Sequence, residues 1–108
     1  MKPYQSVLDK INKIRFRFDL DPLADLPKGD IREPGHCPIA NALFEIDENI
    51  SANPDSLDLP NLTVNQMRAI AEDLGVSYFE ERLWVMTPKD FRKFIREFDD
   101  HFYPQLVL

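Results

Sequence analysis

The sequence predicts a single α+β domain over residues 1–108, in which three or four helices pack on a small β-sheet or hairpin. Apolar residues recur at helical spacing near the C-terminus, and residues 64–74 carry clear helix boundaries. An alternating run near the N-terminus is typical of a strand. Of the 108 residues 44% are hydrophobic, which suffices for one core without disulfide bonds.

The N-terminal segment begins with a short predicted helix. Residues 4–11 place four apolar side chains on one face, namely Tyr4, Val7, Leu8 and Ile11. Residues 14–20 then alternate apolar and charged side chains, which predicts a half-buried strand with Phe16 in the core. A helix that continues through Ile14 and Phe18 is the alternative, because these two residues also fit the helical period.

The middle of the chain alternates between irregular and helical patterns. Residues 21–35 contain several prolines and glycines, so we expect an ordered connector without a regular element. A helix is expected to start at Pro38, and a polar acidic loop follows over residues 47–61. The helix at 64–74 is the best marked, because Thr63 and Gln66 can form its capping box and Gly75 can form its left-handed end.

The C-terminal segment carries the strongest apolar signal. Residues 83–86 form an apolar run that predicts a strand buried on both sides, and Thr87 can cap the helix that follows. The apolar stripe of that helix comprises Phe91, Phe94, Ile95, Phe98 and Phe102. The whole core is expected to draw on Ile14, Phe16, Phe18, Ile39, Leu43, Met67, Ile70, Leu74, Trp84, Phe91, Phe94, Ile95, Phe98 and Phe102.

Acidic residues dominate the middle of the chain. The net charge of the protein is −6, and residues 18–60 contain ten carboxylates against Lys28 and Arg32. Phosphate contact needs Lys and Arg, so this segment disfavours nucleic acid and favours a basic protein surface as partner. The candidate partner-binding residues are Asp47, Glu48, Asp55 and Asp58. Carboxylates that serve only solubility are the simpler alternative.

Residues 64–84 resemble part of a helix-turn-helix motif, which gives the alternative function of a DNA-binding regulator. Its candidate DNA-binding residues are Arg68, Ser77, Tyr78 and Arg82. The segment departs from the motif at Glu81, where an aliphatic core residue is usual, and its second helix would present two carboxylates. A plain helix followed by a glycine C-cap and a turn into the strand at 83–86 is the competing interpretation.

Catalytic, metal and cofactor sites are not expected. Cys37 would lie at a helix N-terminus, which can activate a thiol, but a nucleophile also needs a base such as His36 or His101 within reach. One Cys and two His cannot complete a structural zinc site without a carboxylate. We therefore predict a protein that is not an enzyme, with no cofactor and no metal.

Two sequence blocks carry a family resemblance. The first is Cys37-Pro38-Ile39-Ala40-Asn41-Ala42-Leu43, preceded by Leu26-Pro27-Lys28-Gly29. The second comprises Trp84 to Pro88, then Phe91 to Asp99, and an ending in which Phe98-Asp99 is followed by Tyr103-Pro104-Gln105-Leu106-Val107. In this order they resemble small proteins of actinobacteria and their phages that have no assigned activity. The chain departs from that pattern at residues 100–102, where a Gly is expected before the Tyr-Pro pair.

The resemblance implies a compact accessory protein in which Cys37 and Tyr103-Pro104 are framework residues. A single cysteine suits a reducing compartment, and no apolar run approaches the roughly 20 residues of a membrane span. The sequence therefore predicts a small, non-enzymatic, cytoplasmic and phage-related binding or regulatory protein. Its predicted partner is another protein with a basic surface. No membrane contact is expected, and nucleic acid is a partner only in the helix-turn-helix alternative.

Overall fold

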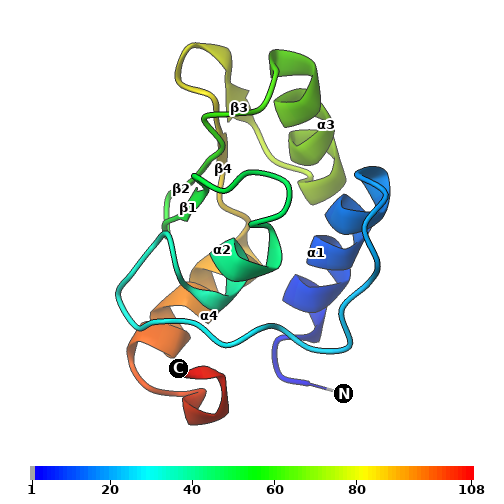
Figure 1. Cartoon of the computed structure of the whole chain (residues 1–108). Coiled ribbons are helices and arrows are strands. Elements are labelled where there is room, and N and C mark those ends of the chain that lie inside the picture. Colours follow the sequence, from blue (N-terminus) through cyan, green and yellow to red (C-terminus); the bar gives the residue numbers. More distant parts are fainter. Residues whose placement is uncertain (1) are drawn as a thin grey trace.

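The computed structural model describes residues 2–108, and over these residues the chain forms four α-helices and one four-stranded antiparallel sheet (Figure 1). The predicted α+β class is confirmed. The helices are α1 (Gln5–Arg17), α2 (Pro38–Ala42), α3 (Val64–Leu74) and α4 (Lys89–Asp99). The strands, in spatial order, are β1 (Ser51–Ala52), β2 (Ser56–Asp58), β4 (Trp84–Met86) and β3 (Tyr78–Phe79). Two short 3-10 turns complete the fold, η1 (Glu80–Arg82) and η2 (Pro104–Leu106).

Helix α1 extends through Arg17, so the predicted strand over residues 14–20 is wrong and the helical alternative is correct. Phe16 consequently points to solvent with 83% of its surface exposed, while Arg15 is buried. The Arg15 guanidinium donates from Nε to the Asp21 carbonyl at 2.8 Å and from Nη1 to the Ala42 carbonyl at 2.9 Å. These bonds tie α1 to the connector and to α2, and they satisfy a cation that would otherwise be costly to bury.

Helix α3 forms as the sequence predicts. The Thr63 hydroxyl accepts from the Gln66 backbone N–H at 3.1 Å, and the Gln66 side chain accepts from the Thr63 backbone N–H at 2.9 Å. Gly75 ends the helix in the left-handed conformation with a φ of 68°. Local sequence fully specifies this element, because both of its ends are satisfied by residues adjacent in the chain.

Helix α4 confirms most of its predicted apolar stripe. Four of its side chains are buried, namely Phe91, Phe94, Ile95 and Phe98. The helix ends at Asp99, so Phe102 falls beyond it and is 62% exposed, contrary to the prediction. Thr87 is not the cap, because it is buried and donates its hydroxyl to the Asn53 carbonyl at 2.7 Å, while Pro88 holds the cap position.

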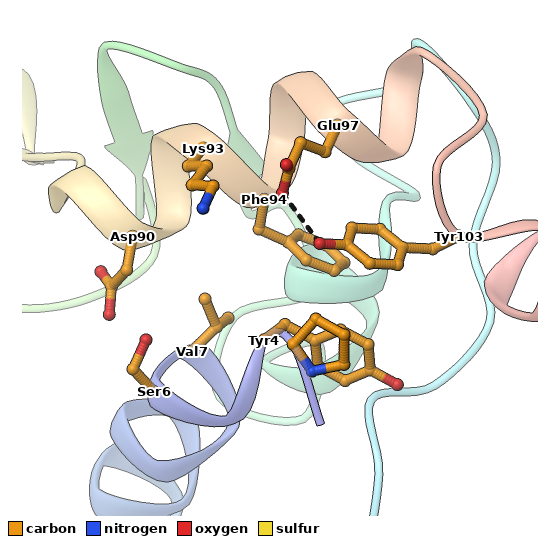
Figure 2. Close-up of a pocket in the computed structure, with 9 residues that line it drawn as sticks. Tyr4, Ser6, Val7, Asp90, Lys93, Phe94, Glu97 and Tyr103 are labelled. Atoms are coloured by element: carbon orange, nitrogen blue, oxygen red, sulfur yellow. Dashed lines mark hydrogen bonds between the residues drawn. The ribbon is translucent and has the colours of Figure 1, made fainter. Parts of the chain in front are cut away.

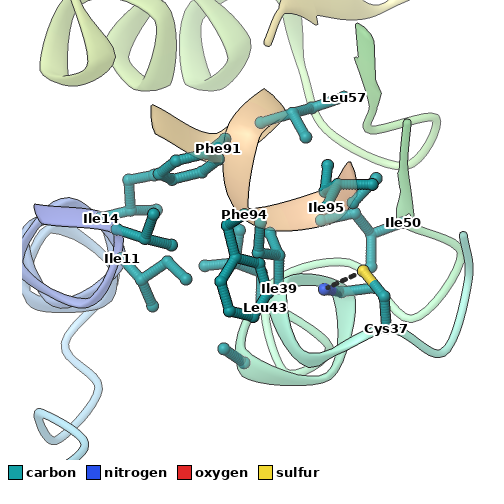
Figure 3. Packing of buried hydrophobic residues seen from close by; sticks show 14 of the residues in the cluster. Ile11, Ile14, Cys37, Ile39, Leu43, Ile50, Leu57, Phe91, Phe94 and Ile95 are labelled. Carbon is teal, nitrogen blue, oxygen red and sulfur yellow. Dashed lines mark hydrogen bonds between the residues drawn. The ribbon is translucent and has the colours of Figure 1, made fainter. Parts of the chain in front are cut away.

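The core lies where the four helices meet the inner side of the sheet, and Figure 3 shows part of it. Ten of the predicted core residues are buried there. They are Ile14, Ile39, Leu43, Met67, Ile70, Leu74, Phe91, Phe94, Ile95 and Phe98. Phe18 and Trp84 are only half-buried. Phe16 and Phe102 are exposed because the helical course of the chain differs from the predicted one at both positions.

The C-terminal segment holds the long connector in place. Gly29 donates its backbone N–H to the Leu106 carbonyl at 2.8 Å, and Leu108 donates to the Gly29 carbonyl at 3.0 Å. Gly29 and Val107 form an isolated parallel bridge. No helix within residues 2–108 combines the length and the apolar character needed to cross a membrane.

Candidate partner-binding surface

The sheet has one buried side and one side that faces solvent. Side chains alternate along each strand, so Leu57 and Val85 point into the core. The residues of the opposite side, here called the outer sheet face, are Ser51, Ser56, Asp58, Phe79, Trp84 and Met86. Each of them is half-buried or exposed. This alternation corrects the prediction that Trp84 belongs to a strand buried on both sides.

Cross-strand pairing aligns four of these side chains in one row. Asp58 lies opposite both Ser51 of β1 and Trp84 of β4, and Trp84 lies opposite Phe79 of β3. Residues that pair directly across antiparallel strands project to the same side, about 5 Å apart. The row therefore places an aromatic pair beside a carboxylate across the whole width of the sheet.

The aromatic pair is the most distinctive feature of this row. The rings of Phe79 and Trp84 stack with 4.7 Å between centroids and 22° between planes. Phe79 is 46% exposed, and Met86, two residues from Trp84 on the same strand, is 39% exposed. Exposed apolar side chains that cluster in this way mark interaction sites more often than isolated ones do.

The turn that joins β3 to β4 adds charge to the rim of the face. Glu80 and Glu81 are exposed on η1, and a hollow of about 400 Å³ opens beside them at the hairpin. Leu83 closes the turn in the left-handed conformation with a φ of 52°. This conformation costs a non-glycine residue about 1 kcal/mol. In Figure 1 the hairpin stands at the top of the view, remote from both termini.

The predicted partner-binding residues do not form one cluster. Asp58 lies on the outer sheet face, where the Ser56 hydroxyl donates to it at 3.1 Å. Asp55 is exposed in the turn between β1 and β2, and Glu48 is exposed in the loop before β1. Asp47 is buried, with only 2% of its surface exposed, so its assignment to a partner surface is wrong.

Asp47 instead holds the acidic loop together. One carboxylate oxygen accepts from the Asn49 backbone N–H and from the Asn61 side chain, each at 2.9 Å. The other oxygen accepts from the Asn61 backbone N–H at 2.9 Å. Because all three donors satisfy the charge within the protein, Asp47 is a structural residue.

The recognition helix needed by a helix-turn-helix is not formed. Residues 78–84 make β3, the η1 turn and the start of β4, so this interpretation of the segment is wrong. Arg68 donates to the Tyr78 hydroxyl and to a Glu80 carboxylate oxygen, each at 3.0 Å, and its guanidinium lies over the Tyr78 ring. Ser77 and Arg82 are exposed, but neither lies on an α-helix that could enter a groove of DNA.

Sequence reasoning missed the exposure of Phe79, Trp84 and Met86. A short antiparallel strand commonly packs only one face on the core, so an apolar run of this length does not by itself indicate burial on both sides. Phe79 belongs to an edge strand of two residues, which no periodicity can identify.

The hollow between α1 and α4 is a second candidate site (Figure 2). Its volume is only about 140 Å³, and the aromatic rings of Tyr4, Phe94 and Tyr103 pack against one another along its wall. The Tyr103 hydroxyl donates to Glu97 at 2.8 Å. Burial and this bond raise the pKa of Tyr103 to about 12. These contacts join the C-terminal segment to α4 and leave no activated group.

Cys37 is a framework residue as well. It is 4% exposed and accepts a long hydrogen bond from the Ala40 backbone N–H at 3.5 Å (Figure 3). Burial raises the pKa of its thiol to about 11, which outweighs the lowering effect of the backbone N–H groups at the start of α2. Within residues 2–108 no group of three or more His, Cys, Asp or Glu side chains could hold a metal ion.

Comparison of the chain with known protein families, with curated proteins and with solved structures finds no match. The function is therefore inferred from the chemistry of the outer sheet face. That surface combines two stacked aromatic rings, a neighbouring carboxylate and further acids on its rim. It offers contact area and negative charge for a binding partner.

Proposed function

We propose that this is a non-enzymatic binding protein whose outer sheet face holds a basic segment of a partner protein. The observation that carries the proposal is the row in which the stacked rings of Phe79 and Trp84 lie beside Asp58. An Arg or Lys side chain of the partner would lie over the indole and form an ion pair with the carboxylate.

Two attractions would act on the cation of the partner, one from the indole ring and one from the carboxylate. A cation within about 6 Å of an indole centroid is attracted by the negative face of the ring. A carboxylate beside the same ring adds a charge-assisted hydrogen bond, and the flat guanidinium of Arg can use both partners at once. Phe79 supports the indole, because its ring stacks on that of Trp84 with 4.7 Å between centroids.

The charge around the face supports a basic partner. Four carboxylates lie on the sheet and its turns, namely Asp55, Asp58, Glu80 and Glu81. Three cations lie in the same region. Arg68 is paired with Glu80 at 3.0 Å, Arg82 is exposed on η1, and Arg92 of α4 donates to the Pro54 carbonyl beside Asp55. The surplus of negative charge would steer a basic segment toward the face and accelerate its association.

The contact would form inside a cell. A single cysteine suits a reducing cytoplasm, and the resemblance to proteins of actinobacteria and their phages suggests a regulatory role in infected cells. The partner class remains a protein with Arg or Lys in an accessible segment.

Trp84 provides the test, because it is the only tryptophan of the chain. Its fluorescence is measured while an Arg-rich peptide is added, with an uncharged peptide of equal length as reference. We expect a saturable change whose midpoint moves to higher peptide concentration as salt is raised. Asp58→Asn should weaken binding about fivefold to tenfold, which is the contribution of one charged contact.

The matched control is Asp100→Asn, which removes the same charge from an exposed position after α4, away from the sheet. It should leave the affinity within about twofold. Equal weakening by Asp58→Asn and Asp100→Asn would mean that only the net charge attracts the peptide. That result, or the lack of any saturable response of Trp84, would overturn the proposal.

A further inference from the structure

A groove of about 470 Å³ lies where α1, the start of α4 and the segment between α3 and β3 meet. Three cations line it, namely Lys10 of α1 and Lys89 and Arg92 of α4, and none of its lining residues is acidic. The chain carries 19 acidic and 13 basic residues, so a groove with only basic charges runs against its overall composition.

Two of the three cations are fixed in position. Lys10 Nζ lies 2.9 Å from an oxygen of Asp90, and Arg92 Nε donates to the Pro54 carbonyl at 3.0 Å. Among the residues that the structure describes, the two terminal nitrogens of Arg92 have no hydrogen-bond partner, so their N–H groups can serve a ligand. Lys89 has no carboxylate within 4.0 Å among the residues that the structure describes. The groove therefore keeps a net positive charge after its internal ion pair is counted.

The remaining lining combines a hydroxyl with apolar surface. Ser77 is exposed, whereas Val76 is half-buried and Met86 is 39% exposed. Nothing lies within 4 Å of the position that a Cβ on Gly75 would occupy, so this side of the groove is open. The site offers a cationic part and an apolar part to a single ligand, and its volume lies within the range of small-molecule sites.

We propose that this groove binds a small organic phosphate, with the phosphoryl group on the three cations and a compact apolar body against Val76 and Met86. A phosphoryl group presents several charged oxygens, which two ammonium groups and one guanidinium can contact together. A single carboxylate would use fewer of these donors. The site is independent of the proposed partner contact, because Met86 alone borders both.

Phenyl phosphate is a suitable probe, with inorganic phosphate as the arm that lacks an apolar body. Amide shifts in nitrogen-15 spectra are followed at constant ionic strength, adjusted with sodium chloride. We expect saturable shifts at Gly75, Ser77 and Lys89, and tighter binding of phenyl phosphate than of inorganic phosphate. Lys89→Gln should weaken the binding of both about tenfold, since it removes one charge-assisted contact.

The matched control is Lys93→Gln, which makes the same charge change on the same helix but lies outside the groove and lines the hollow of Figure 2. It should leave binding within about twofold. Both lysines are exposed, so both variants should fold, and their amide spectra verify this before any titration.

Three results would overturn the proposal. The first is the lack of saturable shifts, and the second is equal weakening by Lys89→Gln and Lys93→Gln, which would indicate general charge screening. The third is binding of short duplex DNA at these amides without binding of phenyl phosphate. Equal affinity for inorganic phosphate and phenyl phosphate would show that Val76 and Met86 do not contact an apolar part of the ligand, and would overturn that part of the proposal.

Discussion

Arg17 at the end of α1 binds Asp73 of α3 through two parallel hydrogen bonds, from Nε to Oδ2 at 2.7 Å and from Nη2 to Oδ1 at 2.8 Å. The pair joins α1 to α3 through two residues that are 56 positions apart in the chain. These hydrogen bonds, and the positive charge of Arg17, hold the pKa of Asp73 below its usual value of 3.8. Burial acts in the opposite direction but is the weaker effect.

The lowered pKa predicts a defined dependence of stability on pH. The ionised form of Asp73 is favoured by folding, so its contribution to the free energy of unfolding is fully present above the unfolded pKa of 3.8. The contribution disappears as the pH falls through the lower, folded pKa. Asp73→Asn should therefore destabilise the protein more at neutral pH than at about pH 2, where part of this contribution is already lost. Urea unfolding at both pH values checks this, and an equal loss at both would contradict the assignment.

Gly29→Ala should destabilise the protein strongly. A Cβ at this position would stand 2.5 Å from the His36 carbonyl oxygen and 2.6 Å from backbone atoms of Cys37 and Pro38. Backbone atoms cannot move aside as a flexible side chain can, so we expect a loss of about 1 to 3 kcal/mol. Gly35→Ala is the matched control, since its nearest contact would be the Ile50 carbonyl oxygen at 3.8 Å. Urea unfolding should show a change within about 0.5 kcal/mol for the control.

Cys37 should be unreactive in the folded protein. Its thiol is buried and its pKa is raised to about 11, so about one thiol in a thousand is ionised at pH 8. We expect labelling by a disulfide reagent to be at least about a hundredfold slower in the native state than in urea, where the thiol becomes accessible. Stoichiometric labelling of the native protein within the time of mixing would contradict the burial of Cys37 and would favour a catalytic role for its thiol.

Sequence patterns predicted the elements whose signals are local. Thr63, Gln66 and Gly75 specify both ends of α3 without any tertiary contact. The buried stripe of α4 follows from helical spacing alone up to Phe98. Phe102 was misplaced because the stripe continues in the sequence after the backbone has left the helix at Asp99.

The site was harder to predict because it depends on what lies across the sheet. Trp84 and Asp58 are 26 positions apart, and only strand pairing makes them neighbours. Asp47 and Asp58 both lie in the acidic segment at 47–61. Asp47 is buried and accepts from three donors, whereas Asp58 belongs to β2 and lies on the outer sheet face. A sequence shows how many carboxylates the chain has, whereas tertiary contacts determine which of them are buried and which are exposed to a partner.

Arg15 and Phe16 show why the alternating run at 14–20 was assigned incorrectly. Alternation predicts that aromatic residues are buried and arginines exposed, and the structure has the reverse at these two positions. The decisive contacts are the carbonyl groups of Asp21 and Ala42, which accept from the Arg15 guanidinium. Neither carbonyl can be recognised as an unpaired acceptor from the sequence, so a pattern of side-chain polarity alone favours the strand.

Substitution should therefore cost much stability at Arg15 and almost none at the neighbouring Phe16. Arg15→Met leaves the carbonyls of Asp21 and Ala42 without a side-chain donor and should cost about 3 kcal/mol of unfolding free energy. Phe16→Ser alters a side chain that is 83% exposed on a helix and should change stability by less than about 0.5 kcal/mol. Glu45→Gln is the control for the ion pair of Arg15, and its exposed carboxylate should contribute below about 1 kcal/mol. Chemical unfolding of the three variants decides the matter, because a buried Phe16 in a strand would make Phe16→Ser the most damaging of them.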